Sequence, residues 1–413
     1  MNGIRLILAV ATGALLAACA HAAGGDRIYA RVVTVDGDEY EGLIRWDKNE
    51  ASWADMLDGI RSSEKGGDDS DRTTRGKTER RIKIFGFTVG TESDSWWSPS
   101  AQCGVRFGHL RRLQPLGDDR ALLEFKSGQR VELSGGSTDL GDGVREIVVE
   151  DPGEGEVHLV WGDIEEVIFQ LTDKDSESVF GERLYGTLTT RRGETFTGFI
   201  AWDVDEVFGQ DVLDGEEGDR SRKIQFAKIK TIERYSSSGA TVSLVSGSDE
   251  LVLRGTNDVN DDNRGIIVAD PSFGQVIVGW DEFERVEFSR PNEDRASYDA
   301  FDGGRPLSGK VATEDGKTYT GRIRWDDDES HTWEILDGDS QDIQFDIEFG
   351  AIKRIEKRTN RSSMVTLWDG REFRLRGSND VDSDNKGIFV TQGDGETVEV
   401  AWEDFASVEF DRR

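Results

Sequence analysis

The stretch G-D-E-Y-E-G-L-I-R-W-D-K-N-E, residues 37–50, decides the fold of this chain because its pattern occurs three times. The pattern G-x-x-[YF]-x-G-x-I-x-W-D-x-x-E returns at 193–206 and at 316–329, and a Leu-Asp-Gly follows each copy. The aromatic residue, the second Gly, the Ile and the Trp lie two positions apart, which is the period of a β-strand with one buried face. The three copies predict three tandem repeat units built from strands.

A second motif, W-x-x-[IF]-x-x-V-x-F, closes each repeat at 161–169, 280–288 and 402–410. Convincing amphipathic helix patterns are absent, so we expect an all-β chain. Unit 1 is longer because residues 60–104 include an insertion rich in Ser, Gly and charged residues. The motifs predict unit 1 at 26–170, unit 2 at 182–288 and unit 3 at 305–410, joined by polar linkers at 171–181 and 289–304.

We expect each unit to consist of two similar halves. Its first half ends in isoleucines three apart, and another strand and a Gly turn follow, as at 365–370. The succession of a strand, a Gly turn and a strand with G-x-I-x-W-D resembles the small barrels of Sm-like and SH3-like folds, over about fifteen residues per copy. The resemblance implies two small five-stranded barrels in each unit, and it implies nothing about RNA.

The N-terminus is typical of a signal peptide, residues 1–22, with Arg5 before an apolar run too short to span a membrane. The tetrapeptide ending at Cys19, L-A-A-C, resembles the bacterial lipobox, which implies a diacylglyceryl thioether on Cys19. Because Ala20 is not the Asp that retains lipoproteins in the inner membrane, the resemblance favours an outer membrane lipoprotein. The alternative is cleavage after Ala22, which would release a soluble periplasmic protein. No later apolar run reaches ~18 residues, so we expect contact with the membrane through the lipid anchor only.

The net charge of −32 argues against nucleic acid as a partner, because phosphate binding needs clustered Lys and Arg. It also argues against adsorption of the body onto an anionic lipid surface. Such a charge favours the binding of basic partners or cations, or it simply keeps the protein soluble. The hydrophobic fraction of 35% is sufficient for a packed core.

Signatures of catalysis are missing from the sequence. There is no G-x-S-x-G, no H-E-x-x-H and no C-x-x-C, and the four His residues occupy unrelated repeat positions. We therefore expect a protein that is not an enzyme and has no cofactor. A hydrolase that uses paired carboxylates, such as those at 326–329, is the enzyme alternative.

Two Asp-rich loops with alternating oxygen side chains have the residue types that calcium prefers. The competing interpretation is a solvated turn in which Asp and Asn side chains bond to their own backbone. A first-unit equivalent replaces two of the three positions with Gly. The candidate calcium ligands are Asp258, Asn260, Asp262, Asp380, Asp382 and Asp384.

The aromatic residues divide into two groups. Trp46, Trp202 and Trp325 could be sugar-stacking platforms, but their period-2 spacing favours the core. Trp96 and Trp97 lie in the insertion, outside the repeat pattern, and are candidate ligand contacts. The remaining Cys103 is expected to be a buried, unpaired thiol.

These features together predict a non-catalytic envelope lipoprotein that binds or scaffolds through tandem β-modules. The expected partner is an envelope protein or another envelope component. Repeated modules suit multivalent contact, because linked weak sites gain effective concentration. A calcium-stabilised extracytoplasmic binding module is the alternative.

Overall fold

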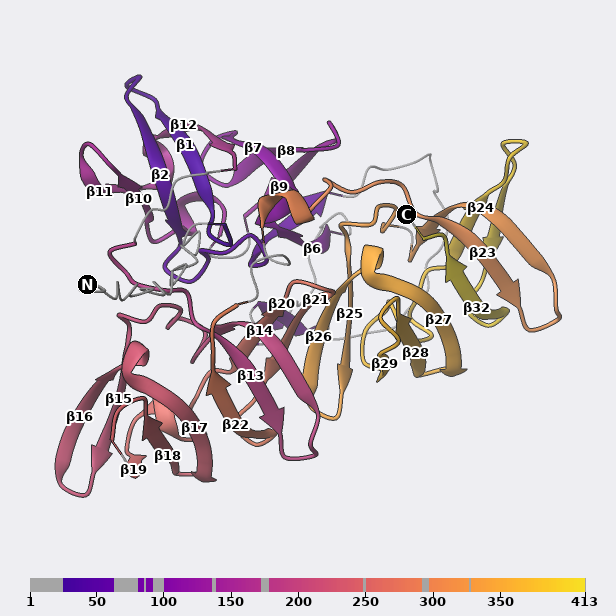
Figure 1. The fold of residues 1–413 in the computed structure, drawn as a ribbon. Coiled ribbons are helices and arrows are strands. Elements are labelled where there is room, and N and C mark those ends of the chain that lie inside the picture. The colour runs from indigo at the N-terminus through magenta and orange to yellow at the C-terminus, as the bar shows by residue number, and fades with distance from the viewer. Residues whose placement is uncertain are drawn as a thin grey trace, which may run out of the picture.

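The prediction of an all-β fold is confirmed by a computed structural model of the chain (Figure 1). None of the helices in the described part of the chain has the length and apolar character needed to cross a membrane. The structure describes residues 25–62, 81–84, 87–91, 100–135, 139–171, 178–247, 250–291, 297–326 and 328–412.

Unit 1 forms one ten-stranded antiparallel sheet in the order β11-β10-β2-β1-β12-β7-β8-β9-β3-β6. Strand β3 continues to Ser62 and β6 begins at Ser100, so the ends of the expected insertion at 60–104 are paired strands. The short strands β4 (Arg81–Ile84) and β5 (Phe87–Thr91) form a separate hairpin. The ten strands are β1 (Tyr29–Thr34), β2 (Glu39–Trp46), β3 (Met56–Ser62), β6 (Ser100–Arg106), β7 (Leu110–Pro115), β8 (Arg120–Phe125), β9 (Arg130–Ser134), β10 (Ile147–Asp151), β11 (Gly155–Leu159) and β12 (Ile164–Phe169).

Unit 2 repeats this order as β21-β20-β14-β13-β22-β17-β18-β19-β15-β16. Its strands are β13 (Tyr185–Thr190), β14 (Thr195–Ala201), β15 (Val212–Glu217), β16 (Arg220–Gln225), β17 (Ile229–Ser236), β18 (Gly239–Leu244), β19 (Glu250–Arg254), β20 (Ile266–Asp270), β21 (Gly274–Val278) and β22 (Phe283–Phe288).

Unit 3 follows the same plan, with an eight-stranded sheet in the order β31-β30-β24-β23-β32-β27-β28-β29. A single bridge between Asp339 and Arg376 connects it to the hairpin β25–β26. The pairings do not establish that any half-unit closes into a barrel, so the Sm-like or SH3-like barrel stays a prediction. The strands are β23 (Ser308–Thr313), β24 (Thr318–Trp325), β25 (Ile335–Ser340), β26 (Ile343–Glu348), β27 (Ile352–Thr359), β28 (Ser362–Leu367), β29 (Glu372–Leu375), β30 (Ile388–Thr391), β31 (Thr397–Val400) and β32 (Phe405–Phe410).

Single turns of 3-10 helix connect some of the strands. Three of them, η1, η4 and η7, begin at a Phe and lie at equivalent places in the three units. The turns are η1 (Phe107–His109), η2 (Gly141–Gly143), η3 (Trp161–Asp163), η4 (Phe226–Lys228), η5 (Asn257–Val259), η6 (Tyr298–Ala300) and η7 (Phe349–Ala351).

The two sequence motifs meet in the core of each unit. Trp46, Trp202 and Trp325 are fully buried, which confirms that these rings belong to the core. Each lies edge-on to the Trp that opens the second motif, with ring centroids 6.3–6.5 Å apart, an arrangement that aromatic rings favour. The motifs therefore recur because together they build one aromatic core per unit.

Units 2 and 3 share a sheet. Strand β26 of unit 3 pairs with β21 of unit 2, and the two strands lie side by side in Figure 1. The pairing brings Gly274 opposite Ile347, with no room for a side chain, because a Cβ on Gly274 would lie 2.0 Å from the carbonyl oxygen of Asp346. The buried apolar residues of the two units form one continuous cluster.

Replacing Gly274 with Ala tests this shared sheet. We expect the free energy of unfolding to fall by about 2 kcal/mol, because the added methyl group meets a neighbouring backbone at a positive φ. Gly279→Ala is the control, since a Cβ there meets nothing within 4 Å. Urea unfolding of both variants measures the difference, and equal small losses would contradict the pairing.

Candidate functional site

A buried ion pair joins the three units at one point. Arg106 of unit 1 and Glu348 of unit 3 occupy the same repeat position, directly before the Phe of η1 and η7. The Arg106 Nε donates to Glu348 Oε1 at 2.7 Å, and its Nη2 donates to the other carboxylate oxygen. The Nη1 of the same guanidinium donates to the carbonyl of Pro271 in unit 2 at 3.1 Å. The Arg106 side chain of unit 1 therefore forms hydrogen bonds with both of the other units.

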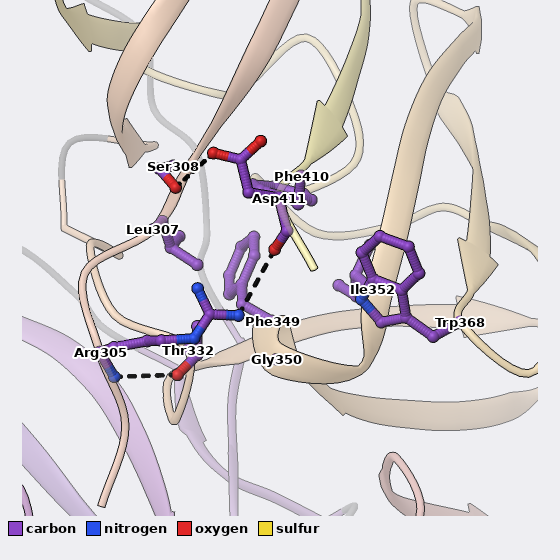
Figure 2. A pocket seen from close by; sticks show the side chains of 10 residues that line it. All are labelled: Arg305, Leu307, Ser308, Thr332, Phe349, Gly350, Ile352, Trp368, Phe410 and Asp411. Carbon is purple, nitrogen blue, oxygen red and sulfur yellow. Dashed lines mark hydrogen bonds between the residues drawn. The ribbon is translucent and has the colours of Figure 1, made fainter. Parts of the chain in front are cut away.

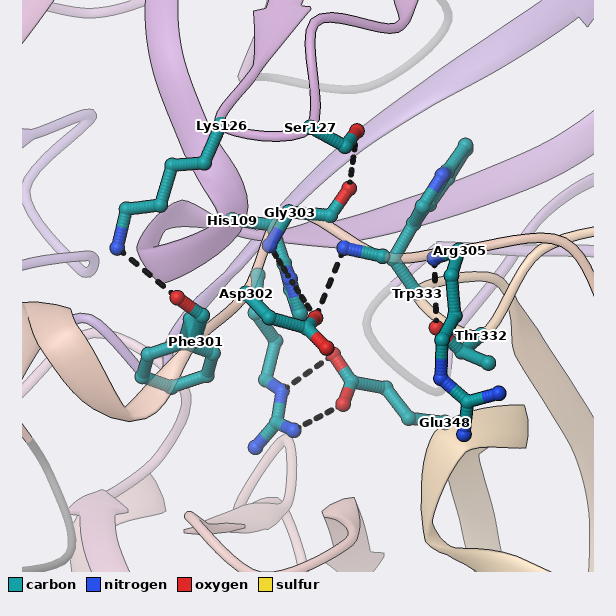
Figure 3. Close-up of polar contacts among 12 residues, drawn as sticks. His109, Lys126, Ser127, Phe301, Asp302, Gly303, Arg305, Thr332, Trp333 and Glu348 are labelled. Carbon is teal, nitrogen blue, oxygen red and sulfur yellow. Dashed lines mark hydrogen bonds and ion pairs between the residues drawn. The ribbon is translucent and has the colours of Figure 1, made fainter. Parts of the chain in front are cut away.

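His109 completes the ion pair. Its Nε2 lies 2.8 Å from Glu348 Oε1, and the N–H of Gly303 donates to its Nδ1 at 3.1 Å (Figure 3). Because Nδ1 accepts a hydrogen bond, the network assigns the ring proton to Nε2, which donates to Glu348. The His109 side chain is only 5% exposed.

The electrostatics of this cluster favour an ionised Glu348. Burial alone would raise its pKa, but Arg106 and His109 more than offset that effect and lower the pKa to about 2. A buried carboxylate held in this way has its charge balanced by specific partners. The cluster therefore ties units 1 and 3 together at neutral pH.

A cavity of about 370 Å³ lies beside the cluster, within the size range of small-ligand sites. All three units and the segment 297–304 contribute to it, so it exists only when the units are assembled. Its polar groups and aromatic rings suit a mixed polar and aromatic ligand. The lining residues include Arg106, His109, Ser272, Phe301, Asp302, Thr332, Glu348, Trp368, Asp369 and Arg412.

The end of the expected second linker is a docked segment. Residues 297–304 lie against unit 1, where Lys126 Nζ donates to the carbonyl of Phe301 at 3.1 Å (Figure 3). Ser127 Oγ donates to the carbonyl of Gly303 at 2.8 Å. Composition indicated a polar linker, but these contacts place part of it in the structure that surrounds the cavity.

The candidate calcium ligands have identifiable structural roles. The carboxylates of Asp258 and Asp380 accept the backbone N–H of the Asp in each Leu-Asp-Gly, at 2.6 and 2.9 Å. Their carbonyls accept the Nε1–H of Trp202 and Trp325, at 2.9 and 3.0 Å. Asp139 does both in unit 1. The first Asp of each loop therefore locks the motif tryptophan in place.

The other loop residues form local turns. Asn260 and Asp382 accept the backbone N–H groups of Asp262 and Asp384, at 2.8 and 2.9 Å, as Asx turns do. Within the described ranges, no group of three or more His, Cys, Asp or Glu side chains is arranged to hold a metal ion. Calcium binding stays a prediction.

The Asp of each Trp-Asp pair is buried at the start of a turn. Asp47, Asp203 and Asp326 have φ of 43–47°, a region that Asp tolerates. Asp47 accepts the backbone N–H of Arg145 at 2.6 Å and lies 2.9 Å from its guanidinium. Asp203 and Asp326 accept the backbone N–H at the equivalent positions. These recurring carboxylates are therefore turn caps.

The Glu that ends the motif is buried in unit 1, as Glu50, and half-buried in units 2 and 3, as Glu206 and Glu329. In each of Glu50, Glu206 and Glu329, one carboxyl oxygen is buried and has no hydrogen-bond partner among the described residues. Burial, with added repulsion from Asp258, raises the pKa of Glu206 to about 9. Burial and neighbouring Asp residues also raise the pKa values of Glu50 and Glu329 well above their ordinary value. Glu206 is therefore protonated at neutral pH, and in Glu50 and Glu329 the same causes favour the protonated form.

Three of the predicted site residues, Cys19, Trp96 and Trp97, lie outside the described residues. Cys103 is a free, partly buried thiol on β6. Burial raises its pKa to about 12, so its thiolate form is scarce at neutral pH.

Removing the charge of Glu348 tests the junction. Glu348→Gln should lower the free energy of unfolding by about 3 kcal/mol, because it leaves the Arg106 guanidinium buried without an anion. The exposed Glu403→Gln is the matched control. Because the folded-state pKa is depressed, the contribution of Glu348 is present above pH 4.5 and is lost as the pH falls toward 2. A variant with wild-type urea midpoints at pH 7 would contradict this account.

The Glu that ends the motif in each unit predicts the opposite pH dependence. Since the folded-state pKa of Glu206 is raised from 4.5 to about 9, its contribution to stability falls as the pH rises through that window. Replacing Glu50, Glu206 and Glu329 together with Gln should flatten the decline in stability between pH 5 and 9. Urea midpoints across that range measure it, and an unchanged slope would refute the assignment.

Comparison with known proteins finds no matching family model, no similar curated protein and no similar solved structure. A function for this chain therefore has to be argued from its own residues and geometry.

Proposed function

We propose that this chain is a non-catalytic envelope protein that binds or scaffolds other molecules through its three β-units. The observation that supports this most is the set of buried bonds that fixes each unit against the others. Units 1 and 3 meet at the Arg106–Glu348 pair, and units 2 and 3 meet along β21 and β26. Surfaces on different units are thus presented in one fixed arrangement, which reduces the entropy lost on multivalent binding.

Units 1 and 2 are joined by a buried bond of the same kind. The Arg183 guanidinium lies 3.1 Å from Asp55, and both side chains are less than 10% exposed. Asp55 also accepts the backbone N–H groups of Ala51 and Ser52 at 2.8 Å, so one carboxylate caps its own turn and bonds a neighbouring unit. An apolar cluster that contains Phe208 adjoins this contact, since Asp55 bonds the N–H of Ala51 and Arg183 the carbonyl of Val207, both in that cluster.

The tether and the charge indicate where binding takes place and with what. A lipid on Cys19 would hold the units close to the outer membrane and raise their concentration relative to other envelope components. A net charge of −32 accelerates encounter with basic surfaces. The partner is therefore an envelope protein or another envelope component, and the membrane itself is contacted only by the lipid.

Affinity purification of the tagged full-length protein from bacterial envelopes tests the proposal, with Cys19→Ala as the control for the tether. We expect a defined partner to co-purify with the wild type and to be depleted when the lipid is lost. A protein that purifies alone, with intact envelopes after deletion of its gene, would contradict a binding role. Turnover by the purified chain in a hydrolase substrate panel would overturn the non-catalytic assignment.

A further inference from the structure

A small hollow opens on unit 3, where β32 ends and β27 begins (Figure 2). Buried Phe349 and Ile352 form its apolar floor, and half-buried Trp368 lies at its side. Together with its open mouth the hollow measures about 210 Å³. Arg305 lies along its edge, where its Nη2 makes one long hydrogen bond of 3.4 Å to the carbonyl of Asp411.

The repeat structure gives this hollow an exact counterpart on unit 1. The N–H of Gly350 donates to the carbonyl of Thr332 at 2.7 Å. In unit 1 the N–H of Gly108 donates to the carbonyl of Trp53 at 2.9 Å, which makes these two pairs equivalent. By the same alignment of strands and turns, Phe349, Ile352, Trp368 and Phe410 correspond to Phe107, Leu110, Lys126 and Phe169.

On unit 1 this place is filled by a tyrosine from the docked segment. The centre of the Tyr298 ring lies 4.4 Å from that of the Trp53 ring, and Lys126 Nζ lies 3.1 Å from the centre of the same tyrosine ring. The Tyr298 hydroxyl donates to the carbonyls of Leu110 and Phe169, at 2.8 and 3.2 Å. These contacts, which we call the tyrosine seat of unit 1, therefore recognise both the ring and the hydroxyl of tyrosine.

The residues around Tyr298 add acidic and apolar contacts. Asp299 and Asp302 interact favourably with the charge of Lys126. The Phe301 ring lies over Gly108, so closely that a Cβ there would be 2.1 Å from it. The segment S-Y-D-A-F-D-G-G, residues 297–304, thus shows what such a seat accepts: a tyrosine followed by acidic and aromatic residues.

Unit 3 offers the same apolar floor, with Arg305 along its edge and Arg412 beside Trp368. The two carbonyls that hold the tyrosine hydroxyl in unit 1 correspond to those of Ile352 and Phe410. The buried Nε of Arg305 has no hydrogen-bond partner within the part of the chain that the structure describes. The Arg412 guanidinium lies 5.3 Å from the Trp368 ring. Asp411, whose carboxylate accepts a hydrogen bond from Ser308 Oγ at 2.6 Å, lines the same hollow, and Asp369 beside Trp368 is paired with Arg371.

We infer that the hollow on unit 3 is a docking site for a tyrosine-containing acidic peptide segment of a partner protein. This deepens the proposed binding function and rests on it. With Trp368 in place the hollow has room for about one water, about 10 Å³, so the half-buried Trp368 ring turns outward as the tyrosine enters. The turned ring then packs on the tyrosine, where unit 1 uses Lys126.

A synthetic peptide with the sequence of residues 297–304, labelled with fluorescein, tests the inference by fluorescence anisotropy on the full chain. We expect saturable binding to one site. Replacing the peptide tyrosine with Ala should weaken binding about tenfold or more, because aromatic anchors dominate such contacts. Arg305→Glu and Trp368→Ala in the protein should each weaken it to a similar extent. Arg220→Glu, the same charge change on exposed β16, is the matched control and should leave the affinity unchanged.

Three results would overturn the inference. The first is no binding at peptide concentrations of about 1 mM. The second is equal affinity in the wild type, Arg305→Glu and Trp368→Ala. The third is binding that Lys126→Ala weakens and Trp368→Ala does not, which would place the peptide on unit 1. Capture of an envelope partner that survives Arg305→Glu and Trp368→Ala would remove this site and leave the proposed binding function standing.

Discussion

The contact of unit 1 with unit 3 centres on one buried charge cluster. Arg106 bonds the carboxylate of Glu348 and a carbonyl of unit 2, and His109 bonds the same carboxylate. Each of these side chains is less than 10% exposed, so its charge or polar group is stable there only while its partners remain in place. Separation of units 1 and 3 would leave these charges exposed or without partners. It would also remove the cavity beside them, because all three units line it.

Within each unit the constraint is the motif tryptophan. Its ring fills the core, and its Nε1–H is satisfied by the carbonyl of an Asp whose own carboxylate holds the Leu-Asp-Gly strand. One residue therefore connects the first motif, the Asp-rich loop and the third strand. This explains why Trp, Asp and Leu-Asp-Gly recur together, while the lengths of the loops between them vary.

The strands and the core could be predicted because period-2 spacing and burial are local properties repeated three times. The junction could not, because it depends on contacts between residues 165 to 242 positions apart. Its only trace in the sequence is that Arg106, Gln225 and Glu348 occupy the same repeat position with different charges. The Asp-rich loops were ambiguous because Asx turns and calcium loops use the same residue types. Docking of 297–304 was missed because a polar composition does not reveal a seat on another unit.

The most direct test of the central claim is the distance between units 1 and 3 in solution. Spin labels at Glu156→Cys on β11 and Glu399→Cys on β31, in a Cys103→Ser background without the N-terminal Cys, would report it by double electron–electron resonance. A rigid assembly predicts a single narrow distance distribution that broadens when Glu348 is replaced by Gln. A broad distribution in the otherwise unmodified chain would show units that move independently, and it would contradict the account.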